Sequence, residues 1–148
     1  MSSGRKRIVV DSNVLVSAAL FPDSPAALAY VAAALHGDLY ASRDTLAEIE
    51  QVLMRPKFDR YFAAGGPTRE RFLGDYRALV NVAEVTLTVT DCPDPKDNQF
   101  LSLALAVDAD LIVSGDRRHL LPMHPYRGIA IVSCEALLRL LAAPGAPL

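Results

Sequence analysis

Four acidic residues stand where they could form a metal site. Asp11 directly follows an apolar, β-branched run, and Asp116 lies just beyond a second such run. Glu48 falls in the first half of an expected helix, and Asp97 stands at the start of a mostly apolar one. Because functional groups in open parallel α/β sheets gather at the carboxyl ends of the strands, we expect these carboxylates to converge there.

Converging carboxylates indicate a particular chemistry. Several of them at one sheet edge would repel one another and raise one another's pKa values. A divalent cation that prefers hard oxygen ligands, Mg²⁺ or Mn²⁺, relieves that repulsion. Such sites activate water and stabilise charge during phosphoryl transfer. The residue types therefore favour a metal centre that acts on phosphate esters.

Each acidic residue also has a purely structural explanation. Asp11 and Asp97 could each cap a helix, and Asp116 could be a turn residue. Glu48 could be a solvated charge at the edge of its helix. At helical pitch Glu48 and Glu50 each lie about 100° from the centre of the apolar stripe, so geometry does not choose between them.

The elements that must position these residues alternate along the chain. Apolar and alternating runs predict strands, and helical periodicity with Ser, Thr or Asp caps predicts helices. The strands are expected at 8–10, 39–41, 85–90, 111–113 and 129–132, and the helices at 25–36, 42–55, 68–80, 97–107 and 135–143. This order predicts an α/β fold with a parallel sheet and helices on both faces. We expect one domain over residues 1–143 and a flexible tail over 144–148.

Composition narrows the possible classes of protein. The chain has 148 residues, of which 51% are hydrophobic and 22% charged, which excludes wholesale disorder. No stretch reaches the roughly 18 uncharged apolar residues of a membrane span. The two cysteines, Cys92 and Cys134, form no CxxC motif and predict reduced thiols in a cytoplasmic protein without a zinc site. His36, His119 and His124 show no metal-ligand spacing.

Four segments in order resemble the motifs of the PIN domain family, and in particular its toxins related to VapC. These segments are VVDSNVLVSAAL, TLAEIEQVLMRPKF, DPKDNQFLSLALA and ADLIVSGDRRHLL. The second places the family glutamate on Glu48 rather than Glu50. By this resemblance the catalytic, metal-binding residues are Asp11, Glu48, Asp97 and Asp116, supported by Asn13 and Ser114, with Asp94 as a further loop carboxylate beside them.

The resemblance also implies a fold and a function. The fold is a three-layer α/β/α sandwich around a mostly parallel sheet. The activity is a Mg²⁺- or Mn²⁺-dependent endoribonuclease, typically the toxin of a type II toxin–antitoxin pair, held by a small antitoxin and often a homodimer. Net charge of −2 and a pI near 5.9 give no nucleic-acid signature for the whole chain, so basic residues must rim the acidic pocket. The candidates are Arg117 and Arg118 above all, then Arg5, Lys6 and Arg7, and Arg55, Lys57 and Arg60.

Other functions fit the residues less well. A PIN-fold module that binds RNA or antitoxin with little catalysis is the main alternative. A haloacid-dehalogenase-type phosphatase requires an aspartate where this chain has Asn13. A response-regulator receiver domain requires an acidic pair before Asp11 and a lysine after the last strand, where the chain has apolar residues and Cys134.

Overall fold

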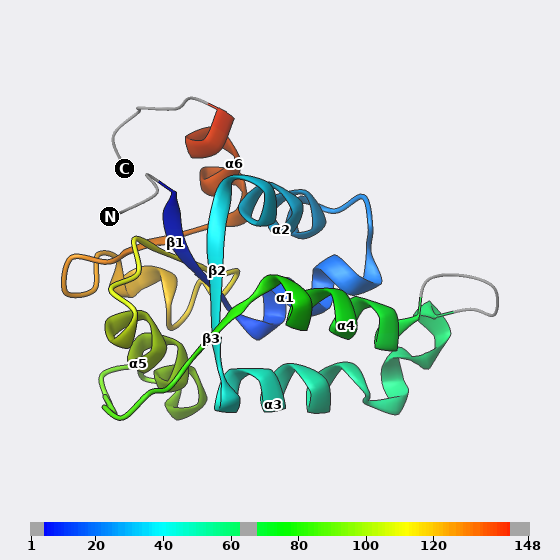
Figure 1. Ribbon diagram of the computed structural model, residues 1–148, viewed down its shortest axis with the longest axis horizontal. Helices are drawn as coiled ribbons and strands as arrows, with labels where there is room; N and C mark the ends of the chain where they lie inside the picture. The colour runs from blue at the N-terminus through cyan, green and yellow to red at the C-terminus, as the bar shows by residue number, and fades with distance from the viewer. Residues whose placement is uncertain (1–4, 63–67, 143–148) are drawn as a thin grey trace.

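The protein is built around a sheet of five parallel strands in the order β3-β2-β1-β4-β5. This description rests on a computed structural model and covers residues 5–62 and 68–142. The strands are β1 (Lys6–Val10), β2 (Gly37–Ser42), β3 (Asn81–Ala83), β4 (Leu111–Val113) and β5 (Ala130–Val132) (Figure 1). The chain enters the sheet at its centre, so β1, which leads to Asp11, has a neighbour on each side.

Helices connect successive strands. They are α1 (Ser12–Leu20), α2 (Pro25–His36), α3 (Arg43–Leu53), α4 (Arg69–Leu79), α5 (Asn98–Ala106) and α6 (Cys134–Ala142), with short 3₁₀ turns η1 (Pro56–Tyr61), η2 (Pro95–Asp97) and η3 (Leu121–Met123). The predicted caps are confirmed at α2 and α4, where the hydroxyls of Ser24 and Thr68 accept backbone N–H groups. At α3 the cap is Ser42, which exchanges hydrogen bonds with Thr45 in a capping box.

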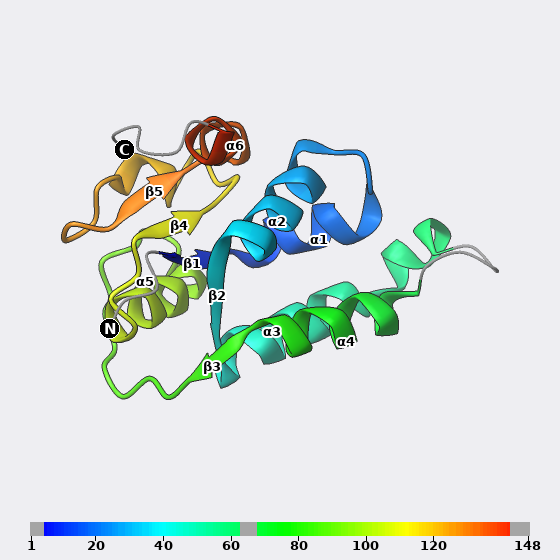
Figure 2. The same cartoon turned by 45° about the horizontal axis from the view of Figure 1, so that its top comes forward.

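Alternate residues of each strand face opposite layers. Ile8 and Val10 pack with α1, α2, α3, α4 and α6, whereas Val9 packs with α5 and with the chain that leads into it. In Figure 2 α2 and α6 lie on one side of β1 and β4, and α5 lies on the other. The sequence-based prediction of a three-layer α/β/α sandwich with a parallel sheet is confirmed.

One predicted strand is wrong. Residues 85–90 are extended but belong to no strand, and the third strand lies earlier, at Asn81–Ala83. After Ala83 the chain leaves the sheet and runs toward α5, where the N–H of Val89 donates to the hydroxyl of Ser102 at 3.1 Å. Val85 and Val89 pack into the α5 layer, so their alternation arises from a chain packed against a helix.

One helix was not among those predicted: α1 begins at Ser12, directly after Asp11, as the alternative of Asp11 as a helix cap required. The remaining differences lie at the ends of elements. The last helix begins at Cys134, one residue before its predicted start at Glu135. The predicted tail over 144–148 lies outside the described residues. No single helix in the described ranges is long and apolar enough to span a membrane; the pair α1 and α2 passes on length and composition together but is bent by 109°.

Candidate metal centre

Asp11 stands at the end of the central strand with both carboxylate oxygens engaged. Its Oδ1 accepts the N–H of Val14 at 2.9 Å and so caps α1, while its Oδ2 accepts the hydroxyl of Ser114 at 2.5 Å. The side chain is 2% exposed. Burial raises the pKa of Asp11 to about 6, despite the hydrogen bonds from Ser114 and Val14 that favour the ionised form. Asp11 thus caps α1, as one alternative expected, and its second oxygen is held by Ser114 at the edge of the sheet where the candidate site is predicted.

Ser114 joins β4 to the loop that carries Asp116. Its N–H donates to the carbonyl of Val132 in β5 at 3.0 Å, which continues the sheet beyond β4. Its buried hydroxyl donates to Asp11 and accepts the N–H of Asp116 at 3.0 Å. Ser114 therefore sets the positions of two of the predicted metal ligands.

Asp116 and Asp97 face each other and share a hydrogen bond. For Asp97, partial burial, the hydrogen bond with Asp116 and the nearby charges of Asp94, Asp116 and Asp11 raise the pKa to about 7. For Asp116, burial acts in the same direction, but the hydrogen bonds from Asp97 and from the backbone of His119 and Arg118 outweigh it, so its pKa is lowered. The pair therefore holds a proton more readily on Asp97 than on Asp116.

Asp97 was expected to be either a helix cap or a metal ligand. It stands at the junction of η2 and α5, yet its side chain makes no capping hydrogen bond. The carboxyl group instead faces Asp116 on the loop after β4. Asp97 therefore occupies the N-cap position of α5, as the alternative expected, but its carboxyl group is not used as a cap.

Asp94 and His119 extend the cluster. Ligand atoms of Asp94, Asp97 and His119 lie within 4.8 Å of one another, and Nδ1 of His119 lies 3.3 Å from Oδ2 of Asp116. Asp94 also accepts the N–H of Lys96 at 3.1 Å and so shapes the turn before Asp97. Sequence reasoning missed His119; the only signal for it was its spacing of three residues after Asp116.

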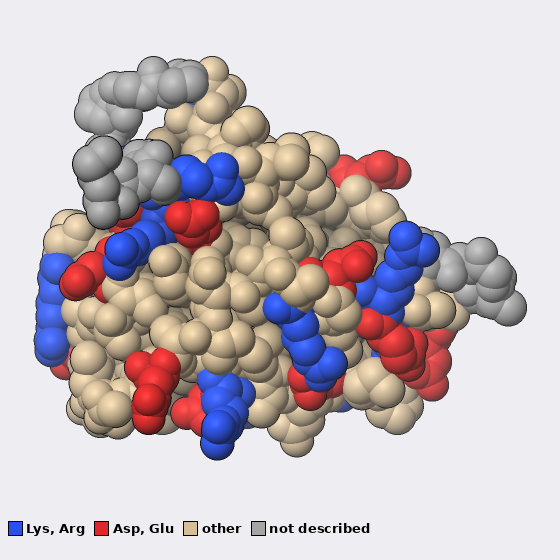
Figure 3. All heavy atoms as spheres, in the orientation of Figure 1, with Lys and Arg blue, Asp and Glu red and all other residues tan. Residues whose placement is uncertain are grey.

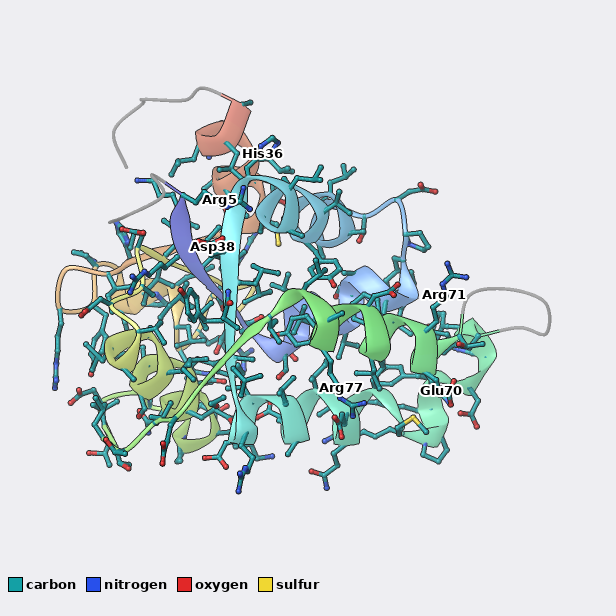
Figure 4. The ribbon with its side chains drawn as sticks, viewed as in Figure 1. Arg5, His36, Asp38, Glu70, Arg71 and Arg77 are labelled. Carbon is teal, nitrogen blue, oxygen red and sulfur yellow. The ribbon has the colours of Figure 1, made fainter. Side chains whose placement is uncertain are left out.

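Glu48 and Glu50 point to different neighbours. The carboxylate of Glu48 accepts the side-chain amide of Gln99, which lies in α5 close to Asp97. Gln99 also donates to the carbonyl of Lys96 at 3.0 Å. Glu50 forms an exposed ion pair with Arg77 of α4 instead (Figure 4). Glu48 thus lies on the α5 side of its helix, next to the segment that carries Asp97.

The polar and basic residues of the predicted site lie at its surface. Asn13 is exposed in the first turn of α1, and Arg117 and Arg118 are exposed directly after Asp116. The N–H of Arg118 donates to Oδ1 of Asp116 at 3.0 Å. On the face seen in Figure 3, Lys and Arg lie beside Asp and Glu and form no single basic patch.

The residues before β1 do not belong to this edge. Arg5 precedes β1 and Asp11 follows it, so they lie at opposite ends of the strand. Arg5 pairs with Asp38 at 2.9 Å and donates to the carbonyl of Gly37 at 2.6 Å, beside His36 (Figure 4). Arg7 donates to the carbonyl of Val107 at 2.8 Å. The expectation that the segment Arg5–Arg7 rims the acidic pocket is wrong. This segment lies at the amino end of β1, whereas Asp11 and the candidate site lie at the carboxyl end.

The donor set fits a hard divalent cation. Asp11, Asp97 and Asp116 supply carboxylate oxygens from three separate segments, and two of these groups have raised pKa values. Burial raises the pKa values of Asp11 and Asp97, and the neighbouring carboxylates raise them further, so a cation bound here would favour their ionised forms. Oxygen donors of this kind suit Mg²⁺ and Mn²⁺.

Comparisons with known proteins agree with this geometry. A chain of the crystal structure of VapBC2 from Rickettsia felis, bound to a DNA fragment from their promoter, superposes with a TM-score of 0.56 and 12% sequence identity. The match covers 86% of this chain and 98% of that one, and it shows a common fold. No curated protein matches the sequence. The family model of the PIN domain matches residues 7–118, so the chain belongs to the PIN domain family.

Proposed function

We propose that this protein is a metal-dependent endoribonuclease that hydrolyses RNA phosphodiester bonds, and that it acts as the toxin of a type II toxin–antitoxin pair. The observation that carries the proposal is geometric: the hydroxyl of Ser114 links the buried carboxylate of Asp11 to the backbone of Asp116, and the carboxyl group of Asp97 lies close to both aspartates. Three segments of the chain bring these carboxyl groups together at the carboxyl edge of the sheet. Carboxyl groups placed this close together can bind a divalent cation that acts on phosphate.

The residues divide the work as follows. Asp11, Asp97 and Asp116 would hold the cation, with Glu48 and Asp94 next to them and Ser114 fixing Asp11 and the Asp116 backbone. When bound, Mg²⁺ or Mn²⁺ lowers the pKa of a water ligand and neutralises charge that develops on the phosphate. Asp97, whose pKa is raised to about 7, would bind the cation in its ionised form. Exposed Arg117 and Arg118 stand where RNA phosphates can reach them.

The biological role rests on the resemblance and the fold. The motifs resemble those of toxins related to VapC, and the fold matches a chain of the VapBC2 complex. These findings support a small antitoxin as the partner. The resemblance alone suggests the homodimer, the cytoplasmic location and RNA as the substrate, while the acidic edge of the sheet supports chemistry on a phosphate ester.

Cleavage of a total RNA pool tests the proposal. Wild-type protein should cleave RNA with Mn²⁺ or Mg²⁺, and EDTA should abolish the cleavage. Asp11→Asn and Asp97→Asn should remove it, whereas Asp23→Asn, in the exposed turn after α1, should leave it unchanged. Equal cleavage by both site variants, purified free of contaminating nuclease, contradicts the proposal. RNA binding without turnover under any divalent metal would favour the binding module instead.

A further inference from the structure

A cavity lies against the candidate metal centre on the side of β5. Its volume is about 290 Å³, and Ser114, Gly115 and Arg117 form part of its wall. Ser114 is also the residue that donates to Asp11. The cavity and the metal centre therefore share a wall, and a chain bound across the metal centre can reach into the cavity.

The cavity is formed where several elements meet. The end of α1, the start of α2, the loop after β4 and the start of α6 all line it. In Figure 2 α6 follows β5 and lies beside α2. Two lining hydroxyls, those of Ser24 and Ser133, accept backbone N–H groups of α2 and α6, each at 3.1 Å. Because these caps hold two walls in place, the cavity is formed in advance of any ligand.

Phe21 is an unusual residue in this wall. It ends α1 and remains 46% exposed, although an aromatic ring of this size normally contributes to a core. Its ring packs edge-on against Tyr61, with centroids 5.3 Å apart. Tyr61 is held in turn by Arg60, which donates to its hydroxyl at 2.8 Å. Phe21 is thus an exposed aromatic ring with a fixed position at the cavity.

The charges around the cavity indicate which part of a ligand enters it. Arg117 and Glu135 both line it, so their charges offset one another and the interior does not favour a phosphate group. Phe21 and Leu121 add apolar surface, and Ser17 adds a hydroxyl. A flat, neutral ring with polar edges suits this lining, while its phosphate remains outside with Arg117.

We propose that this cavity binds a nucleobase of single-stranded RNA next to the phosphate that is cleaved. The inference rests on the proposed ribonuclease function. Unpaired bases are commonly recognised by stacking on aromatic side chains and by hydrogen bonds to their edges. The volume lies just below the roughly 300–1,000 Å³ of pockets for drug-sized ligands, which fits one base. Phe21 supplies the stacking surface and Ser17 a hydrogen-bonding group.

Two variants test the cavity without touching the metal ligands. Phe21→Ala removes the ring, and Ser17→Leu fills the space. Phe21→Ala should lower kcat/KM for a short single-stranded oligoribonucleotide about 5- to 160-fold, the size of one lost base–aromatic stack, and Ser17→Leu should lower it too. Each should leave Mn²⁺-dependent cleavage of the same oligoribonucleotide without the base beside the scissile phosphate unchanged. Leu35→Ala, at the other end of α2 and 64% exposed, is the matched control and should behave as wild type.

A third variant gives a direct binding signal. The chain has no tryptophan, so Phe21→Trp places a single indole at the cavity. Its fluorescence should be quenched by the oligoribonucleotide, and Ser17→Leu in the same background should remove the quenching. This fluorescence signal does not depend on catalysis. The Trp ring also keeps an aromatic stacking surface at the cavity.

The outcomes separate this inference from the proposed function. If wild type cleaves RNA and Phe21→Ala and Ser17→Leu cleave it equally well, the inference is overturned and the ribonuclease function stands. If wild type cleaves nothing but the oligoribonucleotide quenches Phe21→Trp, the nuclease proposal fails and base binding is supported. Absence of quenching at concentrations that saturate wild-type binding overturns base binding.

Discussion

The hydroxyl of Ser114 donates a hydrogen bond to the carboxylate of Asp11 at 2.5 Å. Ser114 follows β4, and Asp11 follows the neighbouring strand β1. These residues are 103 positions apart in the chain, and the parallel register that pairs Val10 with Val113 brings them together. The same hydroxyl accepts the N–H of Asp116. One buried hydroxyl therefore couples two strands and two candidate ligands.

Ser114→Ala should weaken both the fold and the site. It leaves one oxygen of Asp11 and the N–H of Asp116 without their partner in a buried setting, which costs roughly 1–3 kcal/mol. Urea unfolding should show this as a lower midpoint with an unchanged slope. Ser114→Thr, which keeps the hydroxyl, should retain most RNA cleavage, whereas the alanine variant should lose it. Equal activity of the two variants would show that the hydroxyl has no role in positioning.

Burial of Asp11 should make the metal-free protein less stable as the pH rises. The folded pKa is about 6 and the ordinary value is 3.8, so between these values the folded state holds a proton that the unfolded state has lost. The free energy of unfolding therefore falls as the pH rises, and the stability that the protonated carboxyl group contributes is lost by about pH 6. The total loss in the free energy of unfolding approaches about 3 kcal/mol.

Comparison with Asp11→Asn isolates this effect from those of other carboxylates. The asparagine oxygen can still accept the N–H of Val14 and cap α1. In EDTA, the stability of wild type relative to Asp11→Asn, measured by urea unfolding, should fall between pH 4 and pH 7. A constant difference across that range would contradict the raised pKa.

Metal binding should release a proton from Asp97. Its pKa of about 7 in the metal-free protein means that it is largely protonated at pH 6, and a bound cation requires the ionised form. Asp11, with a pKa of about 6, adds a further fraction of a proton. Titration calorimetry of Mn²⁺ in buffers of different ionisation enthalpy should find roughly one to two protons released near pH 6 and few near pH 8. Affinity should rise with pH through this range, and Asp97→Asn should lose the larger part of the proton release. Affinity independent of pH in wild type is the contrary result.

Sequence and structure agree where the signals are local. Short apolar runs locate β1 and β4, and Ser24 and Thr68 mark the starts of α2 and α4, because strand burial and capping depend on a few adjacent residues. The alternation over 85–90 was misleading because only Val85 and Val89 pack into the α5 layer, while Leu87 between them is exposed.

Other features required three-dimensional contacts. His119 lies near Asp94 and Asp97 only because η2 and the loop after β4 meet, and its spacing from Asp116 does not by itself predict that contact. Glu48 and Glu50 are equivalent on their own helix. They differ only because α5 lies beside one and α4 beside the other.

This difference between the two glutamates leads to a matched experiment. Glu48→Gln should lower RNA cleavage by more than the roughly 10–100-fold typical of residues that only orient a ligand. Glu50→Gln removes an exposed ion pair with Arg77, worth about 0–1 kcal/mol, and should leave cleavage intact. Initial rates with Mn²⁺ at equal protein concentration decide the matter. Equal loss in both variants, or in neither, would remove Glu48 from the site.

Arg117 and Arg118 should contribute to RNA binding through phosphate contacts. If each neutralises one phosphate of a single strand, Arg117→Ala and Arg118→Ala should each reduce the slope of log K against log salt by about 0.7. Equilibrium binding to a single-stranded oligoribonucleotide at several salt concentrations measures that slope. Arg5→Ala is the control, because Arg5 lies at the other end of β1, paired with Asp38. An unchanged slope in both loop variants, or an equal change in Arg5→Ala, would place the RNA elsewhere on the protein.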